Sequence, residues 1–169
     1  QKEEGHLDKE NLITSFNPAV KKASPAVVNI YSEMLVNKKN RNLFFSDRFN
    51  SIFGKNNTRV QSSLGSGVIF SSDGYILTNQ HVIGDVSIGI TVELSDGRKK
   101  EASIVGIDKG TDLAVLKIDQ EDEVPSMEIG NSDNLKIGDI VLAIGNPYGL
   151  GKSVSMGIVS ATGREFNNP

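Results

Sequence analysis

Two side chains in this sequence could work together as an acid–base pair. His81 follows shortly after the apolar run 75–78, and Asp112 comes immediately before the apolar run 113–118. A carboxylate that accepts the Nδ1 proton of a histidine fixes the tautomer of the ring and stabilises the imidazolium that forms during acyl transfer. Histidine followed by aspartate is one of the known orders of a catalytic triad, and it requires a serine further along the chain.

Both residues also have a purely structural interpretation. A lone histidine is more often a structural polar group than a catalyst, and Asp112 could simply cap a turn. His6, the other histidine, lies in a charged segment and is interpreted as solvated. The two histidines lie far apart in a chain without cysteine, so no metal-ligand spacing is present and no metal or other cofactor is expected.

A second candidate is the stretch Gly145-Asn-Pro-Tyr-Gly-Leu-Gly-Lys-Ser153, which looks like the end of a phosphate-binding loop. Counting back from Gly151 puts Asn146 where the first glycine of that loop belongs. The loop also requires a helix after Ser153, whereas residues 152–163 alternate with period two and contain two glycines, as in a strand. We therefore predict a connection between β units and no nucleotide site.

The composition excludes several classes of protein. The 169 residues are 37% hydrophobic, which suffices for a core, and the formal net charge of -3 gives no general attraction to nucleic acid. The chain has no cysteine, which excludes disulfides and thiol nucleophiles and leaves the compartment open. No apolar run approaches the roughly 18 residues needed to span a membrane, so we expect a soluble chain. Because the sequence begins without Met, it is consistent with a processed chain from which a signal peptide or a membrane anchor has been removed.

The elements that must position these residues are predicted to be β-strands. Seven β-type runs occur with no long helical pattern among them, and they cover 26–31, 67–70, 75–78, 88–94, 102–107, 113–118 and 140–144. Asp73-Gly74 and Asp96-Gly97 supply hairpin turns between such runs. Short strands with short connections favour an all-β fold, a closed antiparallel barrel without exposed edges.

Two stretches depart from this pattern. The amino-terminal arm is charged, and residues 17–24 could form a short helix that Pro25 ends. Residues 34–62 form a long polar insertion that contains four of the seven phenylalanines. Its Phe45, Phe49 and Phe53 have helical spacing, so the insertion is either a short amphipathic helix packed on the barrel or an exposed apolar loop that contacts partners.

Five motifs in order resemble those of the HtrA/Deg serine endopeptidases, closest to their DegS-like and DegQ-like bacterial branch. They lie in this order within residues 64–163. The motifs are Ser66-Gly-Val-Ile, Asp73-Gly-Tyr-Ile-Leu-Thr-Asn-Gln-His81, Thr111-Asp112-Leu-Ala-Val-Leu-Lys117, Gly138-Asp-Ile-Val-Leu-Ala-Ile-Gly-Asn-Pro147 and Gly157-Ile-Val-Ser-Ala-Thr-Gly163. The resemblance implies a chymotrypsin-like pair of six-stranded barrels with the active site between them. It identifies His81 with the general base and Asp112 with the acid that orients it, while Asp108 does not match the catalytic position and is interpreted as a turn residue.

The family's nucleophile lies in a Gly-Asn-Ser-Gly-Gly motif that does not occur before Pro169. Gly130-Asn131-Ser132 is followed by Asp-Asn instead and is rejected as the nucleophile. We therefore expect an arm at 1–25, the first protease barrel at 26–146, and at 147–169 a linker with the first strand of a truncated second barrel. Such a chain alone is predicted to be inactive, because its catalytic serine lies elsewhere.

The resemblance also implies a cell-envelope quality-control or stress-response peptidase that cuts misfolded or regulatory proteins. It further implies a homotrimer or larger assembly, a periplasmic location and a lost membrane anchor. The alternatives are a non-catalytic chaperone-like or oligomerisation module that binds unfolded polypeptides, and a fragment left by autolysis or cloning.

Overall fold

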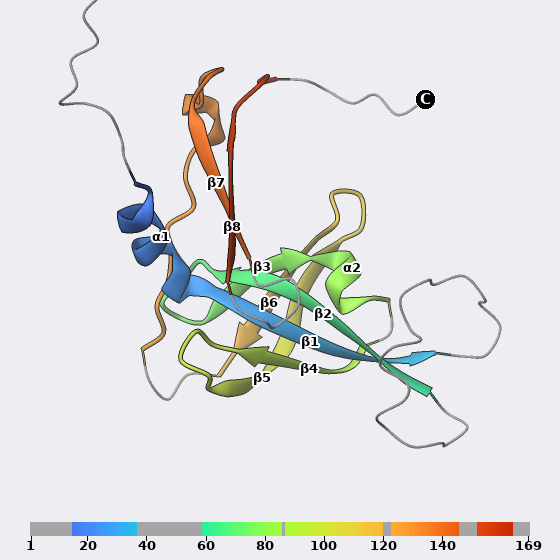
Figure 1. The fold of residues 1–169 in the computed structure, drawn as a ribbon. Helices are drawn as coiled ribbons and strands as arrows, with labels where there is room; N and C mark the ends of the chain where they lie inside the picture. The colour runs from blue at the N-terminus through green and yellow to red at the C-terminus, as the bar shows by residue number, and fades with distance from the viewer. Residues whose placement is uncertain (1–14, 37–58, 86, 120–122, 146–151, 164–169) are drawn as a thin grey trace, which may run out of the picture.

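The computed structural model describes residues 15–36, 59–85, 87–119, 123–145 and 152–163 (Figure 1). The chain enters through α1 (Asn17–Ala23), with Pro18 in its first turn, and through the 3-10 turn η2 (Ser24–Ala26). Proline fits the first turn of a helix because the N–H that it lacks has no partner there. The predicted short helix is therefore confirmed.

Six strands close into one antiparallel barrel in the order β1-β2-β3-β6-β5-β4, which confirms the predicted fold class. In chain order the strands are β1 (Val27–Val36), β2 (Arg59–Ile69), β3 (Tyr75–Asn79), β4 (Ser87–Glu93), β5 (Lys99–Asp108) and β6 (Leu113–Ile118). The β1–β4 pairing joins the two ends of the sheet, so the closed sheet satisfies most of its backbone groups internally.

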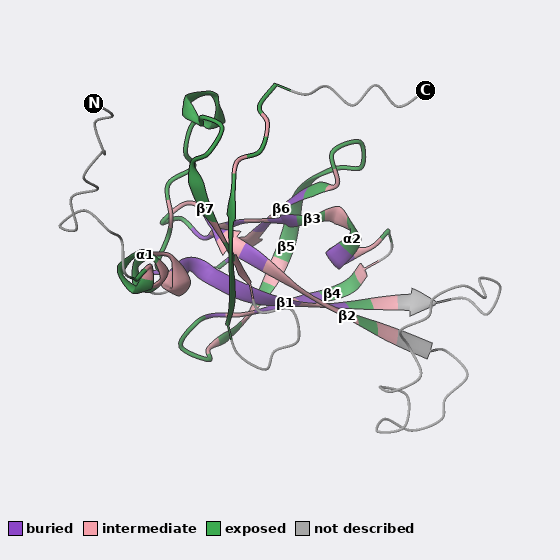
Figure 2. Ribbon diagram, turned by 45° about the horizontal axis from the view of Figure 1, so that its top comes forward, coloured by how far each residue is buried: buried purple, intermediate pink, exposed green. Residues whose placement is uncertain are grey.

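The core fills the inside of this barrel, because successive side chains of a strand point to opposite faces. Branched aliphatic residues of β1, β2, β3, β4 and β6 are buried there (Figure 2), whereas β5 adds only the partly buried Ala102. Among them Ile30, Ile69, Ile76, Leu116 and Ile118 have no exposed surface. The predicted Asp-Gly turns are also present, and Gly74 and Gly97 have φ angles of 84° and 89°, which side chains with a Cβ adopt only with strain.

The first two strands are longer than the sequence pattern predicts. β1 and β2 pair continuously from Val27↔Val68 to Val36↔Arg59, into the segment predicted as a polar insertion. Serines and Gln61 lack the apolar alternation of a strand, but the backbone pairing between the two strands holds them extended. Residues 37–58, with the predicted phenylalanine-rich helix or loop, lie outside the described residues, as does the arm before residue 15.

The assignment of residues 140–144 to the first barrel is wrong. β7 (Ile140–Gly145) pairs with β8 (Ser153–Ile158) in a separate two-stranded sheet that extends away from the barrel (Figure 1). The barrel is already closed and offers β7 no free edge. A short apolar run predicts that a segment is a strand but does not identify its partner. The strand predicted after Ser153, which excludes the helix of a phosphate-binding loop, is confirmed.

Gly67 is expected to be essential for packing, because a Cβ there would lie 2.7 Å from Ile30 Cδ1 and 2.9 Å from Ile76 Cγ2. Gly67→Ala should lower the free energy of unfolding by about 1–3 kcal/mol through overpacking. Gly89→Ala is the control, since nothing lies within 4 Å of its Cβ. Urea denaturation followed by circular dichroism gives both values, and equal midpoints would contradict this account of the core.

Candidate active site

The pairing of β3 with β6 brings the two predicted residues to one end of the barrel. Asn79, the last residue of β3, lies opposite Leu113, the first residue of β6, in the antiparallel register. His81 follows Asn79 by two positions and Asp112 precedes Leu113 by one. Residues distant in sequence therefore meet because the chain leaves β3 and enters β6 at the same place.

His81 belongs to a short helix rather than to the strand end itself. The backbone of Asn79 is still extended, and α2 (Gln80–Ile83) begins directly after it. Val82 and Ile83 are buried in the core cluster, whereas 70% of the His81 side chain is exposed. Burial of its two neighbours therefore directs the imidazole outward, onto the surface of the barrel.

Asp112 ends the β5–β6 turn in a rare backbone conformation. Its φ of 57° is positive, which no other non-glycine residue shows in the part of the chain that the structure describes. Aspartate tolerates this left-handed region better than most residues. In this conformation the Asp112 carbonyl accepts a hydrogen bond of 3.0 Å from the backbone N–H of Gln80. The turn is thus tied to the start of α2.

The Asp112 carboxylate holds His81 with both oxygens. Oδ2 lies 2.6 Å from His81 Nδ1, and Oδ1 accepts a hydrogen bond of 2.9 Å from the His81 backbone N–H. Asn79 Nδ2 donates to Asp112 Oδ2 at 3.3 Å and to its carbonyl at 3.1 Å. One carboxylate therefore fixes the backbone and the ring of the histidine together.

These contacts also set the charge of the pair. The backbone N–H of His81, and then its ring, hold the pKa of Asp112 below the ordinary value, although burial acts in the opposite direction. An ionised carboxylate only accepts hydrogen bonds, so Nδ1 of His81 is the donor. Nε2 is then free of its proton in the neutral ring and can act as a base toward solvent, as the predicted role requires.

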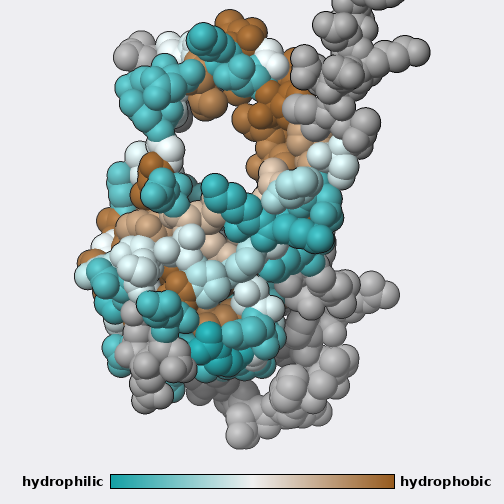
Figure 3. All heavy atoms as spheres, turned by 90° about the vertical axis from the view of Figure 1, so that its left-hand side faces the viewer, coloured by the Kyte–Doolittle hydropathy of each residue, from teal (hydrophilic) through white to brown (hydrophobic). Residues whose placement is uncertain are grey.

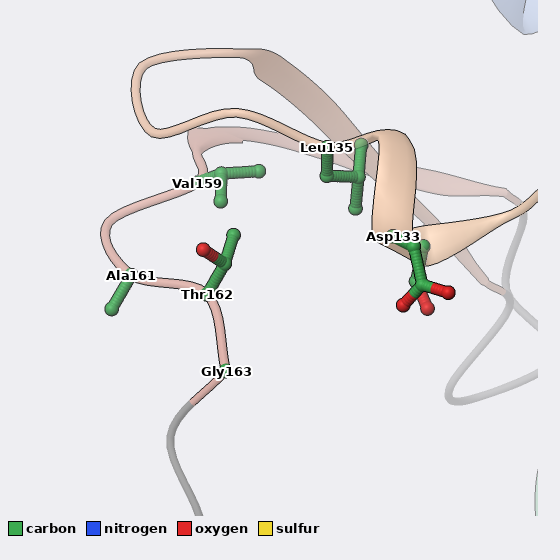
Figure 4. Close-up of a pocket in the computed structure, with 7 residues that line it drawn as sticks. Asp133, Leu135, Val159, Ala161, Thr162 and Gly163 are labelled. Atoms are coloured by element: carbon green, nitrogen blue, oxygen red, sulfur yellow. The ribbon is translucent and has the colours of Figure 1, made fainter.

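The other residues singled out from the sequence lie elsewhere. Asp108 is a turn residue: Oδ1 accepts from the Gly110 N–H at 2.9 Å and Oδ2 from the Thr111 hydroxyl at 2.8 Å. Ser132 lies in the 3-10 turn η3 (Ser132–Asn134). It lines an open cavity beside the β7–β8 sheet, around which Leu135, Val159 and Thr162 gather (Figure 4).

Asn79 is not among the site residues predicted from the sequence. Its position two residues before His81 offers a weak signal, because the amide can donate to whatever carboxylate holds the histidine.

A second contact that the sequence does not indicate joins the segment after α2 to the β5–β6 turn. Asp85 Oδ1 lies 2.7 Å from Lys109 Nζ and accepts from Gln80 Nε2 at 3.1 Å. This exposed ion pair contributes little to stability, but it links the segment after α2 to the β5–β6 turn that carries Asp112.

Two further observations concern the described residues alone. No group of three or more His, Asp or Glu side chains there could hold a metal ion. No helix within the described ranges is long and apolar enough to cross a membrane.

Comparison with known proteins relates this geometry to a family. The family described as "Trypsin-like peptidase domain" matches residues 65–169. Serine endoprotease DegS of Salmonella typhimurium is 45% identical over 92% of this chain, and a probable periplasmic serine endoprotease DegP-like of Pseudomonas fulva is 43% identical over 92%. A solved structure of a variant of the HtrA-type protease AlgW with a decapeptide covers 90% of this chain and 47% of its own, with 47% identity and a TM-score of 0.75.

The chain spans only 39% and 36% of the lengths of the two curated relatives. The pair His81 and Asp112 lies within the segment that the family match covers.

The lowered pKa of Asp112 predicts a specific pH dependence of stability. A carboxyl whose pKa is depressed in the folded protein stabilises the fold above its unfolded pKa, near 3.8, and this contribution disappears as the pH falls through the lower folded value. The stability difference between wild type and Asp112→Asn should therefore be largest near neutral pH and shrink below 3.8. Urea midpoints of both proteins at about pH 6 and about pH 3 test this, and a constant difference would refute it.

Proposed function

Because this chain belongs to the trypsin-like peptidases, in their HtrA/Deg branch, we propose that it supplies the base half of a serine endopeptidase active site. The observation that carries the proposal is the 2.6 Å contact between His81 Nδ1 and Asp112 Oδ2, reinforced by the bond from the His81 backbone to Oδ1. Both residues occur in the family's motifs, and a module that only binds polypeptides has no use for such a pair.

In this reaction His81 Nε2 takes the proton of a serine hydroxyl as the serine oxygen attacks the carbonyl carbon of the substrate peptide bond. Asp112 keeps the proton on Nδ1 and stabilises the imidazolium. The imidazolium then protonates the leaving amine, which breaks the C–N bond and leaves an acyl-enzyme. Water, activated by the same nitrogen, hydrolyses this ester and restores the serine.

The nucleophile is proposed to come from a part of the protein beyond this chain. The described β7–β8 sheet supports a continuing second barrel, since its large apolar side chains are exposed: Ile140 by 50%, Met156 by 63% and Ile158 by 61%. In Figure 3 hydrophobic residues of this upper part face the opening between it and the barrel. Further strands would cover them. We accordingly divide the chain into an arm, a first barrel that ends with β6, and the beginning of a second barrel at β7.

The second barrel would also cover the catalytic pair. In this chain 70% of the His81 side chain and 43% of the Asp112 side chain are exposed, whereas the triad aspartate of a complete site is buried. Exclusion of water strengthens the electrostatic interactions at the site. The pair is thus preformed by the first barrel, and its environment is completed by the second.

Location, substrates and assembly are proposed from the relatives. The DegP-like relatives are named probable periplasmic endoproteases, and the solved AlgW structure carries a decapeptide. We place the protein in the periplasm, where it would cut misfolded or regulatory proteins, as a homotrimer or larger assembly tethered to the inner membrane by a segment outside this chain. No cofactor takes part in the reaction.

His81→Ala in the full-length protein should lower kcat/KM for casein cleavage by a factor on the order of 10⁴ or more, because the nucleophile loses its base. Asp112→Ala should act in the same direction, through the loss of the correct tautomer and orientation. Proteolysis of casein followed by fluorescence gives the rates.

Ser132→Ala and Asp108→Asn are the matched controls, and both should retain activity within a few-fold of wild type. Full activity of His81→Ala, or loss of activity in Ser132→Ala, would overturn the assignment of roles.

A further inference from the structure

The helix that carries His81 cannot hold its own position. α2 has 4 residues, and the hydrogen bond from Gly84 N–H to the Gln80 carbonyl at 2.9 Å closes its single turn. Helix formation has a costly nucleation step, so one turn is not stable in isolation. Its carbonyl groups at the carboxyl end also lack partners within the helix. The orientation of His81 therefore depends on what the neighbouring elements do to α2.

The β1–β2 pair forms a close-fitting seat for this helix. A Cβ on Gly65 of β2 would lie 2.5 Å from Val82 Cγ2, so only glycine lets Val82 approach the strand. A Cβ on Gly84 would overlap Met34 Sδ of β1. Val82 and Gly84, which follow His81, thus pack closely against β2 and β1, two strands that lie far from His81 in the sequence.

Ser32 makes the polar contact within this seat. Its hydroxyl donates to the carbonyl of Ile83 at 2.9 Å, and its side chain has no exposed surface. A second hydroxyl, that of Ser87, lies 3.1 Å away. Ile83 is itself fully buried, so water cannot replace Ser32 as the donor. The bond therefore anchors the carboxyl end of α2 to the centre of β1.

His81 is held on both sides as a result. On the amino-terminal side, Asp112 accepts from the backbone N–H groups of Gln80 and His81. On the carboxyl-terminal side, the anchor is the bond from Ser32 to Ile83. Without the second anchor only apolar contacts hold the carboxyl end of α2, and these fix its rotation less closely than a directional hydrogen bond does. We therefore expect a small displacement of Nε2 relative to the nucleophile.

We propose that Ser32 is a positioning residue of this active site: it fixes the direction of His81 Nε2 by tying the carboxyl end of α2 to β1. The proposal rests on the proposed peptidase function, and it concerns neither substrate binding nor the reacting atoms. It is specific to the hydroxyl, because an alanine fits the same space and leaves the apolar contacts of the seat in place.

Ser32→Ala in the full-length protein should lower kcat by about 10- to 100-fold, the effect of displacing a catalytic group by a fraction of an ångström to 1 Å. KM for a short peptide substrate should stay unchanged, since Ser32 contacts no substrate. The proton resonance of the hydrogen bond between His81 Nδ1 and Asp112 should shift or broaden in the NMR spectrum, which a loss of overall stability alone does not cause. Ser32→Thr, which keeps the hydroxyl, should recover part of kcat and the wild-type resonance.

Tyr31→Phe is the matched control on the same strand. It also removes one hydroxyl, which donates to Glu93 Oε2 at 2.6 Å, and it should leave kcat and the resonance unchanged. Wild-type kcat in Ser32→Ala, or an equal fall of kcat in Tyr31→Phe, would overturn the role of Ser32.

If Ser32→Ala does not fold, Ser32→Cys, with a similar volume and a weaker donor, is measured in its place with the same expected directions. An inactive wild-type protein would instead refute the proposed function and leave the resonance as the test of Ser32.

Discussion

The rest of the site depends on the two contacts that the Asp112 carboxylate makes with His81, one with its backbone N–H and one with its ring. This arrangement requires Asp112 to lie beside the start of α2, and the register of β3 with β6 places it there. The left-handed backbone of Asp112 then turns its carbonyl toward the Gln80 N–H. Closure of the barrel, the left-handed backbone of Asp112 and the contact between His81 and Asp112 are therefore parts of one constraint.

The barrel explains why such a pair can persist on an exposed surface. An exposed contact of this kind contributes little by itself, yet here the two residues belong to elements that buried side chains hold in place. Ile76 and Leu116 pack in the core beneath β3 and β6, and Ile83 anchors α2. Free energy from apolar burial thus holds polar groups that would not stay in place through their own attraction.

Sequence patterns predict the parts of this structure that depend on local chemistry. Apolar runs bounded by turns predicted strands β3 and β6, Asp-Gly predicted the turns, and the position of His81 after one strand and Asp112 before another indicated that the two could work together. Such local patterns do not predict which strands pair with each other: β7 pairs with β8 rather than joining the barrel. For the same reason Ser32, a small polar residue 51 positions before its partner Ile83, has no signal in the sequence. The positive φ of Asp112 likewise arises from tertiary contacts, because aspartate by itself prefers other conformations.

The proposed function requires that His81 and Asp112 activate a serine supplied by a later part of the protein. The most direct test labels the full-length protein with a serine-directed phosphonate and locates the modified residue by peptide mass spectrometry, alongside the His81→Ala variant. We expect one labelled serine beyond Pro169, and much slower labelling in the variant. Labelling of Ser132, or labelling that does not depend on His81, would contradict it.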